Sequence, residues 1–253
     1  PETVEQIEYE EYTLFVRPRD YVSGELFLYG EYEPFLTKTI ESLVSEGDVV
    51  IDIGAHVGHH SLTMRRKTGE TGEVHLFEPH PQLHQLLEKT VAANDFENVH
   101  VHSVALTEQA DQFQLSEGDH HQNNLGGSSL TSDTNSEIMH DVEGVRFDDF
   151  IGDDLNVDSI NLVKMDVEGY EGNVLKGMGD MLGSVDYILM ELHHYALSAT
   201  EQTELLETLL EQGSIVDIEN DRTINSSADF VDQKRTHILW FREGVDSPKS
   251  FST

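Results

Sequence analysis

The sequence predicts an α/β fold, in which a seven-stranded, mostly parallel sheet carries helices on both faces and follows a small N-terminal cap. Short apolar runs that suit buried strands alternate along the chain with segments of helical periodicity, as in parallel sheets. The 253 residues fit one domain of this kind, and no repeat or linker divides them. We therefore expect a single domain, with the cap and a helix in residues 1–46 and the core in residues 47–253.

The expected elements follow in order from the N-terminus. The alternating segments YTLFV and ELFLYG, within residues 1–30, suggest a hairpin or cap. Leu36, Ile40, Leu43 and Val44 then recur with helical spacing, and Gly47 ends that helix. Core strands are expected at 49–53, 74–77, 99–104, 160–165 and 187–191, helices at 81–93, 172–182 and 200–212, and closing strands at 214–218 and 237–241.

A polar segment at about residues 107–146 separates the third and fourth core strands. It lacks the pattern of a buried element, so we interpret it as a loop insertion. Long irregular segments in compact domains are commonly functional, and Gly126–Gly127 would supply a hinge. A substrate lid is therefore our hypothesis, and a passive surface loop is the alternative.

Charge is the strongest signal of the composition. Fifteen Lys and Arg against 49 Asp and Glu give a net charge of −34, spread along the chain. Molar salt screens such repulsion, because the Debye length falls to about 3 Å at 1 M, and we infer a halophilic source. An acidic surface also disfavours nucleic acid as a partner, since phosphates require basic contacts. The regular strand and helix patterns argue against a disordered acidic chain.

The same composition bears on location. No apolar run approaches the roughly 20 residues of a membrane helix, and no basic and then apolar leader opens the chain. We expect a cytoplasmic protein without a membrane span. The absence of cysteine removes disulfides and thiolate chemistry from consideration.

A glycine-bearing turn, Asp52–Gly58, follows the first core strand, where a ligand can approach the backbone closely. The dinucleotide fingerprint would need glycine at 52, 54 and 57, so NAD fits poorly. An acidic Asp52 instead suits a cofactor that carries a cationic sulfonium and no pyrophosphate. Glu78 ends the second strand, where a carboxylate can accept both ribose hydroxyls. Glu78 as one more surface carboxylate is the alternative.

From about Tyr32 to Glu191 the chain resembles the FkbM-type methyltransferases. The motifs that carry the resemblance are YEP at 32–34, GDVVIDIGAHVGHHSL at 47–62, FEPHP at 77–81, NVHVHSVALTE at 98–108, SSL at 128–130, FDDFI at 147–151, LVKMDVEGYEGNVLKG at 162–177 and ILMELHH at 188–194. The resemblance implies a class I methyltransferase (Rossmann-like) fold, S-adenosylmethionine as methyl donor and usually a hydroxyl acceptor. His56 and His59–His60 depart from the residues common in the family.

These motifs and strand ends give the expected site. We predict that the cofactor is bound by Asp52, Gly54, Ala55, His56, Gly58, Glu78, Pro79, Ser103, Val104, Ala105 and Asp166. The catalytic candidates end the fourth and fifth strands and are Asp166, Glu168, Glu191 and His193. Either His193 or a carboxylate acts as general base, or Asp166 and Glu191 hold a divalent ion that acidifies the acceptor hydroxyl. We favour the version without metal.

Two further side-chain patterns have competing interpretations. Glu171 opens a helix, where a carboxylate complements the helix dipole without any catalytic role. His100 and His102 share one strand face and suggest a metal pair, but the strand is expected at the sheet edge and can simply be solvated.

The sequence as a whole predicts an O-methyltransferase that acts on a small metabolite or glycan precursor. An N- or RNA methyltransferase is the alternative among methyltransferases. A non-catalytic module that keeps the fold is the alternative from another class, and an oxidoreductase comes third. Preference for NAD over S-adenosylmethionine would identify the oxidoreductase.

Overall fold

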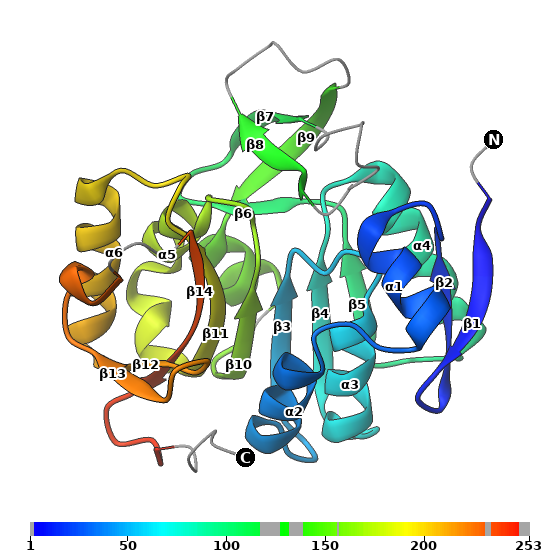
Figure 1. Ribbon diagram of the computed structural model, residues 1–253, viewed down its shortest axis with the longest axis horizontal. Helices are drawn as coiled ribbons and strands as arrows, with labels where there is room; N and C mark the ends of the chain where they lie inside the picture. The colour runs from blue at the N-terminus through cyan, green and yellow to red at the C-terminus, as the bar shows by residue number, and fades with distance from the viewer. Residues whose placement is uncertain (1–2, 117–126, 132–138, 156, 231–233, 248–253) are drawn as a thin grey trace.

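The computed structural model describes residues 3–116, 127–131, 139–155, 157–230 and 234–247. Its main sheet has eight strands in the spatial order β13-β12-β14-β11-β10-β3-β4-β5 (Figure 1). The five strands from β11 to β5 pair in parallel, and β14, β12 and β13 complete the sheet in antiparallel pairs. The strands are β3 (Val49–Ile53), β4 (Glu73–Phe77), β5 (Val99–His102), β10 (Ile160–Met165), β11 (Val185–His193), β12 (Gly213–Asp217), β13 (Arg222–Ile224) and β14 (Arg235–Arg242).

Seven of these strands are the ones expected from the sequence, and β13 extends the sheet at one edge. The extra strand forms because Asp217, at the end of β12, closes a tight turn. Its carboxylate accepts hydrogen bonds from Asn220 and from Arg222, the first residue of β13. The edge position expected for the third core strand, β5, is confirmed.

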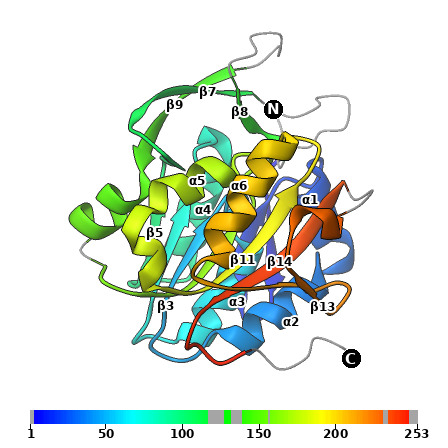
Figure 2. The ribbon, with the colours of Figure 1, turned by 90° about the vertical axis from the view of Figure 1, so that its left-hand side faces the viewer.

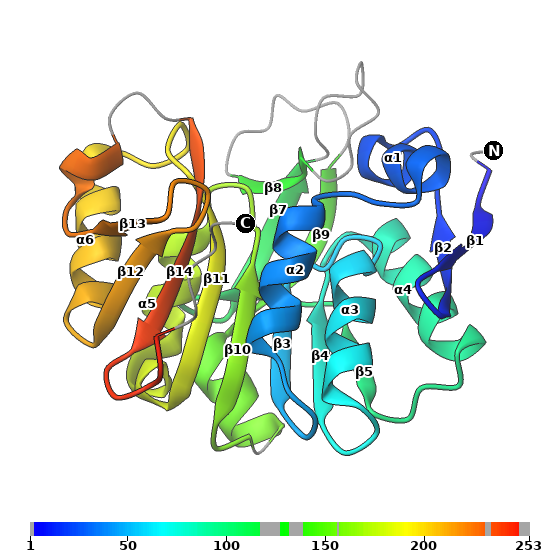
Figure 3. The same ribbon diagram turned by 60° about the horizontal axis from the view of Figure 1, so that its bottom comes forward.

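Helices cover both faces of the sheet, as Figures 2 and 3 show from two directions. One face packs against α2, α3 and α4 through a cluster that includes Ile40, Met64 and Leu87. The other face packs against α5 and α6 around Val174 and Leu206. The helices are α1 (Tyr21–Tyr29), α2 (Pro34–Leu43), α3 (His59–Thr68), α4 (Pro81–Ala93), α5 (Glu171–Met178) and α6 (Ala199–Leu210), with shorter helical segments at Asp149–Asp154, Gly179–Ser184 and Ser227–Phe230.

The N-terminal cap is a hairpin followed by a helix. Strands β1 (Glu5–Tyr9) and β2 (Tyr12–Val16) pair in antiparallel register, and β2 lies against α4. The segment ELFLYG belongs to α1 and not to a strand, because both ends of a helix are fixed there. Asp20 caps the first turn by accepting a hydrogen bond from the Ser23 amide, and Gly30 ends the helix with a φ of 75°.

The expected loop at 107–146 is wrong where the structure describes it. Strands β6 (Ala105–Thr107), β7 (Asp111–Ser116), β8 (Ser129–Thr131) and β9 (Met139–Arg146) form a second sheet, in the order β6-β9-β7-β8. Leu115 and Val142 are buried in it. The polar composition hid these strands, because Gln and Asp alternate with few apolar residues on β7. Gly126, half of the expected hinge, lies outside the described residues.

None of the helices in the described ranges combines the length and the apolar character that crossing a membrane requires.

Candidate active site

A cavity of about 180 Å³ lies at the carboxyl edge of the parallel strands. Its walls come from β3, β4 and β10 with the turns that follow them, from β11, from the segment after β5, from the cap, from the start of β14 and from the second sheet. In open α/β sheets this edge is where ligands bind. The residues that line it include Tyr21, Tyr32, Glu33, Gly54, Ala55, His56, His59, His60, Glu78, Pro79, Val104, Ala105, Leu115, Leu130, Lys164, Asp166, Glu168, Glu191 and Arg235.

The turn after β3 brings main chain to the cavity wall. Gly54 has a φ of 76°, and a Cβ there would lie 1.9 Å from the carbonyl oxygen of Asp166, so no other residue fits without a backbone shift. The amides of Gly54 and Ala55 donate to the Phe77 carbonyl at 2.9 and 3.2 Å. Gly58 opens α3 with a φ of 87°, and a Cβ there would lie 2.6 Å from Leu87. Gly58 therefore shapes the turn without lining the cavity.

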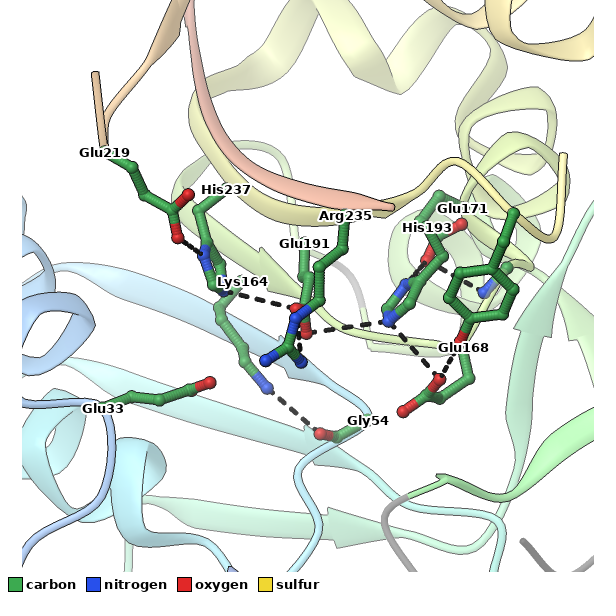
Figure 4. A network of polar contacts seen from close by, with 12 residues as sticks. Glu33, Gly54, Lys164, Glu168, Glu171, Glu191, His193, Glu219, Arg235 and His237 are labelled. Atoms are coloured by element: carbon green, nitrogen blue, oxygen red, sulfur yellow. Dashed lines mark hydrogen bonds and ion pairs between the residues drawn. The ribbon is translucent and has the colours of Figure 1, made fainter. Parts of the chain in front are cut away.

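Asp52 lies behind the cavity wall and not on it. Its side chain is fully buried, where it accepts a hydrogen bond from Ser61 at 2.5 Å and pairs with the Lys164 ammonium at 3.2 Å. Lys164 also donates to the Gly54 carbonyl at 3.1 Å (Figure 4). Asp52 thus fixes the glycine turn through Lys164, and the predicted direct contact with a cofactor is absent from this geometry.

Glu78 is held rigidly at the end of β4. One carboxylate oxygen accepts the His56 amide and the other accepts the His80 amide, both at 2.9 Å. Burial raises the pKa of Glu78 to about 6, against the lowering effect of these two amides. Because each carboxylate oxygen has two lone pairs, both can still accept a ligand hydroxyl.

The His56 side chain points toward the cap. Its Nε2 lies 3.4 Å from an Asp20 carboxylate oxygen, which links the start of α1 to the cofactor turn. Burial lowers the pKa of His56, but the Asp20 and Glu78 carboxylates outweigh it, so the net shift is upward. The predicted contacts Pro79, Val104 and Ala105 also line the cavity, whereas Ser103 is exposed and does not.

His193 is the centre of a buried polar cluster at the ends of β10 and β11 (Figure 4). Its Nδ1 lies 2.7 Å from Glu171, and its Nε2 lies 3.4 Å from Glu168 and 3.7 Å from Glu191. Burial lowers the pKa of His193, but Glu171 and the surrounding carboxylates raise it to about 9. The imidazole is therefore protonated near neutral pH and cannot accept a proton there.

Glu191 lines the cavity beside this imidazolium. Burial and the neighbouring Asp166 raise its pKa to about 7, against His237, His193 and Arg235. Arg235 pairs with one Glu191 oxygen at 3.0 Å. The carboxylate can therefore exchange a proton near neutral pH.

The other two catalytic candidates follow β10. Asp166 lines the cavity, and its Oδ1 is buried without a hydrogen-bond partner. Glu168 has a φ of 51° and accepts a hydrogen bond from the Tyr195 hydroxyl at 2.9 Å. Burial and Asp166 raise the pKa of Glu168. The structure thus brings all four predicted catalytic residues into one cluster.

Glu171 has a larger part in this site than its place at a helix start suggested. It lies in the first turn of α5, but it is fully buried and accepts hydrogen bonds from the Gly169 amide and the His193 ring. A buried carboxylate next to a histidine fixes the ring's orientation and proton. The sequence could not predict this contact, because Glu171 and His193 are 22 residues apart in the chain.

Three groups among the described residues bring metal-ligand atoms within 4.8 Å of one another. They are Asp166 with Glu191 and His193, Glu33 with His59 and His60, and Glu73 with His75 and His100. The first group contains the carboxylate pair expected from the sequence. The second lies on the cavity wall, and the third lies on β4 and β5.

Comparison with known proteins agrees with this geometry. Residues 52–216 match the model of the Methyltransferase FkbM domain. Methyltransferase 1 of Beauveria bassiana is 26% identical over 162 residues, which are 56% of this chain and 64% of that protein. Hexuronic acid methyltransferase AglP of Haloferax volcanii is 28% identical over 153 residues, 58% of this chain and 57% of that protein. The chain therefore spans less than two thirds of the length of these relatives.

Solved structures agree on the fold. A Streptococcus mutans protein described as a SAM-dependent methyltransferase superposes with a TM-score of 0.50 at 10% identity, over 95% of this chain and 56% of that one. The sheet order and the matched domain define a methyltransferase domain with the class I fold. The chain belongs to the FkbM methyltransferase family.

Proposed function

We propose that the protein transfers a methyl group to a hydroxyl oxygen of a sugar or glycan precursor. One observation carries the proposal: a rigid carboxylate, Glu78, and a carboxylate that titrates near neutrality, Glu191, line the same cavity. The similarity to a hexuronic acid methyltransferase supports a sugar-like acceptor.

The residues of the cavity fit the donor. Glu78 offers two oriented oxygens for the ribose hydroxyls, and Gly54 and Ala55 line the cavity without a bulky side chain. Asp166, with its unpartnered buried oxygen, suits the donor's ammonium group. When bound, S-adenosylmethionine would supply the methyl group from its sulfonium sulfur, and the donor would leave as the neutral thioether S-adenosylhomocysteine.

The charge of the cavity supports the same assignment. The described lining carries five carboxylates and two cations: Glu33, Glu78, Asp166, Glu168 and Glu191 against Lys164 and Arg235. Lys164 is further neutralised by Asp52. A wall of this sign suits a cationic donor and repels a phosphate backbone, which favours a small acceptor over RNA.

We propose that Glu191 is the general base that accepts the proton of the acceptor hydroxyl. The hydroxyl must lose its proton as the carbon–oxygen bond forms, and the base must lie within reach of that oxygen. His193 is already protonated near neutral pH, because Glu171 holds it, so it orients Glu191 and does not act as the base. This sequence of steps needs no metal ion.

The acceptor would enter between the cap and the start of β14. Tyr21 and Tyr32 contact edge to face, with ring centroids 6.2 Å apart, and both line the cavity. Arg235 also lines the cavity, paired with Glu191. Aromatic rings and a few directed polar groups are typical of small-ligand sites.

The second sheet supports the lid hypothesis in a changed form. Leu115 on β7 and Leu130 on β8 line the cavity, so this sheet forms part of its wall. We propose that these strands cover the bound donor and restrict access of water to it.

Calorimetric titration with S-adenosylhomocysteine, in molar KCl, tests the donor half of the proposal. We expect saturable binding that Glu78→Ala abolishes and that Glu88→Gln, on the exposed side of α4, leaves unchanged. A methyl-transfer screen against free hexuronic acids, hexoses and lipid-linked sugars then tests the acceptor half. Failure to bind S-adenosylhomocysteine would contradict the proposal. Binding without methyl transfer to any acceptor would favour a non-catalytic module.

A further inference from the structure

Four polar side chains share one face of the sheet at its β4–β5 edge, away from the cavity. His75 and His100 are partners in the parallel register, and their rings stack with centroids 4.9 Å apart. The Nδ1 of His75 lies 3.3 Å from the Nε2 of His102, and its Nε2 lies 3.3 Å from Glu73. Figure 1 shows β5 as the last strand on this side of the sheet. The side chains therefore come from two adjacent strands, one of them an open edge.

Burial differs across this group in a way that suits ion entry. The His75 ring is buried, whereas the Glu73 side chain is 51% exposed and His100 is half-buried. An ion can thus reach the group from the solvent at Glu73 and His100. Its inner boundary is the buried core beside Phe77, whose ring stacks on His102 with centroids 4.6 Å apart.

The positions of the side chains favour a shared ion. His75 and His100 are register partners on adjacent strands, and the Nε2 of His75 lies 3.3 Å from Glu73. An imidazole nitrogen offers a lone pair to a transition metal.

The proposed methyl transfer makes no use of this group. None of the four side chains lines the cavity. Glu73 begins β4, at the end opposite the carboxyl edge where Glu78 follows the strand. A role for these residues therefore has to be found outside the catalytic site.

We propose that Glu73, His75 and His100 bind one divalent transition-metal ion of the Zn²⁺ type. One ligand atom from each of the three lies within 4.8 Å of the others, which a single ion can bridge. Water completes the coordination on the exposed side. Two imidazoles and one carboxylate are a donor set that zinc accepts, and they are too nitrogen-rich for Mg²⁺ or Ca²⁺.

His102 is the positioning residue of this site. When the Nε2 of His75 binds the ion, its proton resides on Nδ1, which then donates to the Nε2 of His102. Without the ion, Nε2 donates to Glu73 instead. Ion binding thus replaces the hydrogen bond between His75 and Glu73 with a metal–nitrogen bond. Because the ion links β5 to β4 only when the protein is folded, it should stabilise the folded state.

The test is titration of the chelator-treated protein with Zn²⁺ in molar salt, followed by calorimetry and by the melting temperature. We expect His100→Gln and Glu73→Gln to weaken binding at this site at least about tenfold and to remove the rise in melting temperature that Zn²⁺ causes. His102→Ala should weaken binding less. Co²⁺ absorption in the visible range reports the same site independently of activity.

The matched control is His84→Gln, a histidine on α4 outside the group. This variant should keep wild-type Zn²⁺ affinity. All variants should bind S-adenosylhomocysteine as the wild type does, which shows that they are folded and separates this test from that of the methyl transfer. Wild-type Zn²⁺ affinity in both His100→Gln and Glu73→Gln, or equal loss in His84→Gln, would overturn the proposal.

Discussion

At the scale of single residues, Glu78 and Glu191 show how different neighbours give two buried carboxylates different roles. Both are buried at strand ends. Glu78 is fixed by two backbone amides, which cannot titrate. Glu191 is flanked by the side chains of Arg235, His193 and His237 and not by backbone amides. The first arrangement suits a constant binding contact, and the second suits proton exchange.

The proton assignment predicts the pH dependence of the reaction. Because the pKa of Glu191 is raised to about 7, the carboxylate is protonated below that pH and the rate should rise as pH increases through about 7. Glu191→Gln should lower kcat about 10²–10⁴-fold and remove this rising limb, since a general base contributes on that order. Binding of S-adenosylhomocysteine should persist. Glu207→Gln, on the exposed side of α6, is the control, and an unchanged pH profile in Glu191→Gln would rule out the assignment.

The glycine turn allows a second prediction at this scale. Gly54→Ala should destabilise the protein by about 1–3 kcal/mol and weaken donor binding, because the added methyl group meets the Asp166 carbonyl and the φ of 76° is strained for alanine. Gly172→Ala is the matched control, since a Cβ there meets nothing within 4 Å. It should be neutral or stabilise α5 by up to about 1 kcal/mol. Equal unfolding free energies for the two variants, measured with denaturant, would contradict this account.

At the scale of elements, the start of α1 is coupled to the donor turn. Asp20 caps α1 and also faces His56. Asp20→Ala should reduce stability by about 1 kcal/mol through the lost cap and should also weaken binding of S-adenosylhomocysteine. Asp20→Asn should keep the cap and lower the pKa of His56, which NMR titration can follow.

Helix α6 supplies the comparison for this coupling. Ser198 and Glu201 form a capping box there, and neither residue lines the cavity. Ser198→Ala should lose a similar free energy of unfolding while donor binding stays intact. If Asp20→Ala affected stability alone, as Ser198→Ala does, the cap would be independent of the donor turn.

The elements also show what the sequence could predict. The strands at Val49–Ile53 and Ile160–Met165 and the helix at Pro81–Ala93 have the predicted bounds, because apolar runs and the proline at the helix start are local signals. The alternation in ELFLYG suggests a hairpin or cap, but the segment lies in helix α1, because the ends of this helix depend on Asp20 and Gly30 and not on periodicity. The second sheet was missed because polar strands gain stability from pairing with distant segments.

The residues of the site were likewise predictable where local sequence signals place them and not where distant contacts do. Strand ends and glycines indicated Gly54, Glu78 and the four catalytic candidates, because all parallel strands end at the same edge. The sequence could not show that Asp52 turns inward toward Lys164 or that Glu171 reaches His193. Those contacts depend on side-chain packing between segments far apart in the chain.

At the scale of the whole molecule, net charge dominates. A charge of −34 on 253 residues is strongly self-repelling in dilute buffer, and salt screens it. The melting temperature should therefore rise steadily from about 0.1 M to molar KCl. Sucrose at matched water activity, which does not screen charge, should give a smaller rise. A melting temperature independent of salt would refute the inference of a halophilic source.

Some residues of the cavity wall lie inside the matched family domain, and others lie outside it. The matched family domain, residues 52–216, holds the donor turn and the catalytic cluster. Tyr21, Tyr32 and Arg235 lie outside that range, yet they line the same cavity. Under the proposed function, these three side chains would set acceptor preference. Single substitutions at Tyr21, Tyr32 or Arg235 would then redesign it without removing Asp20, which links the cap to the donor turn.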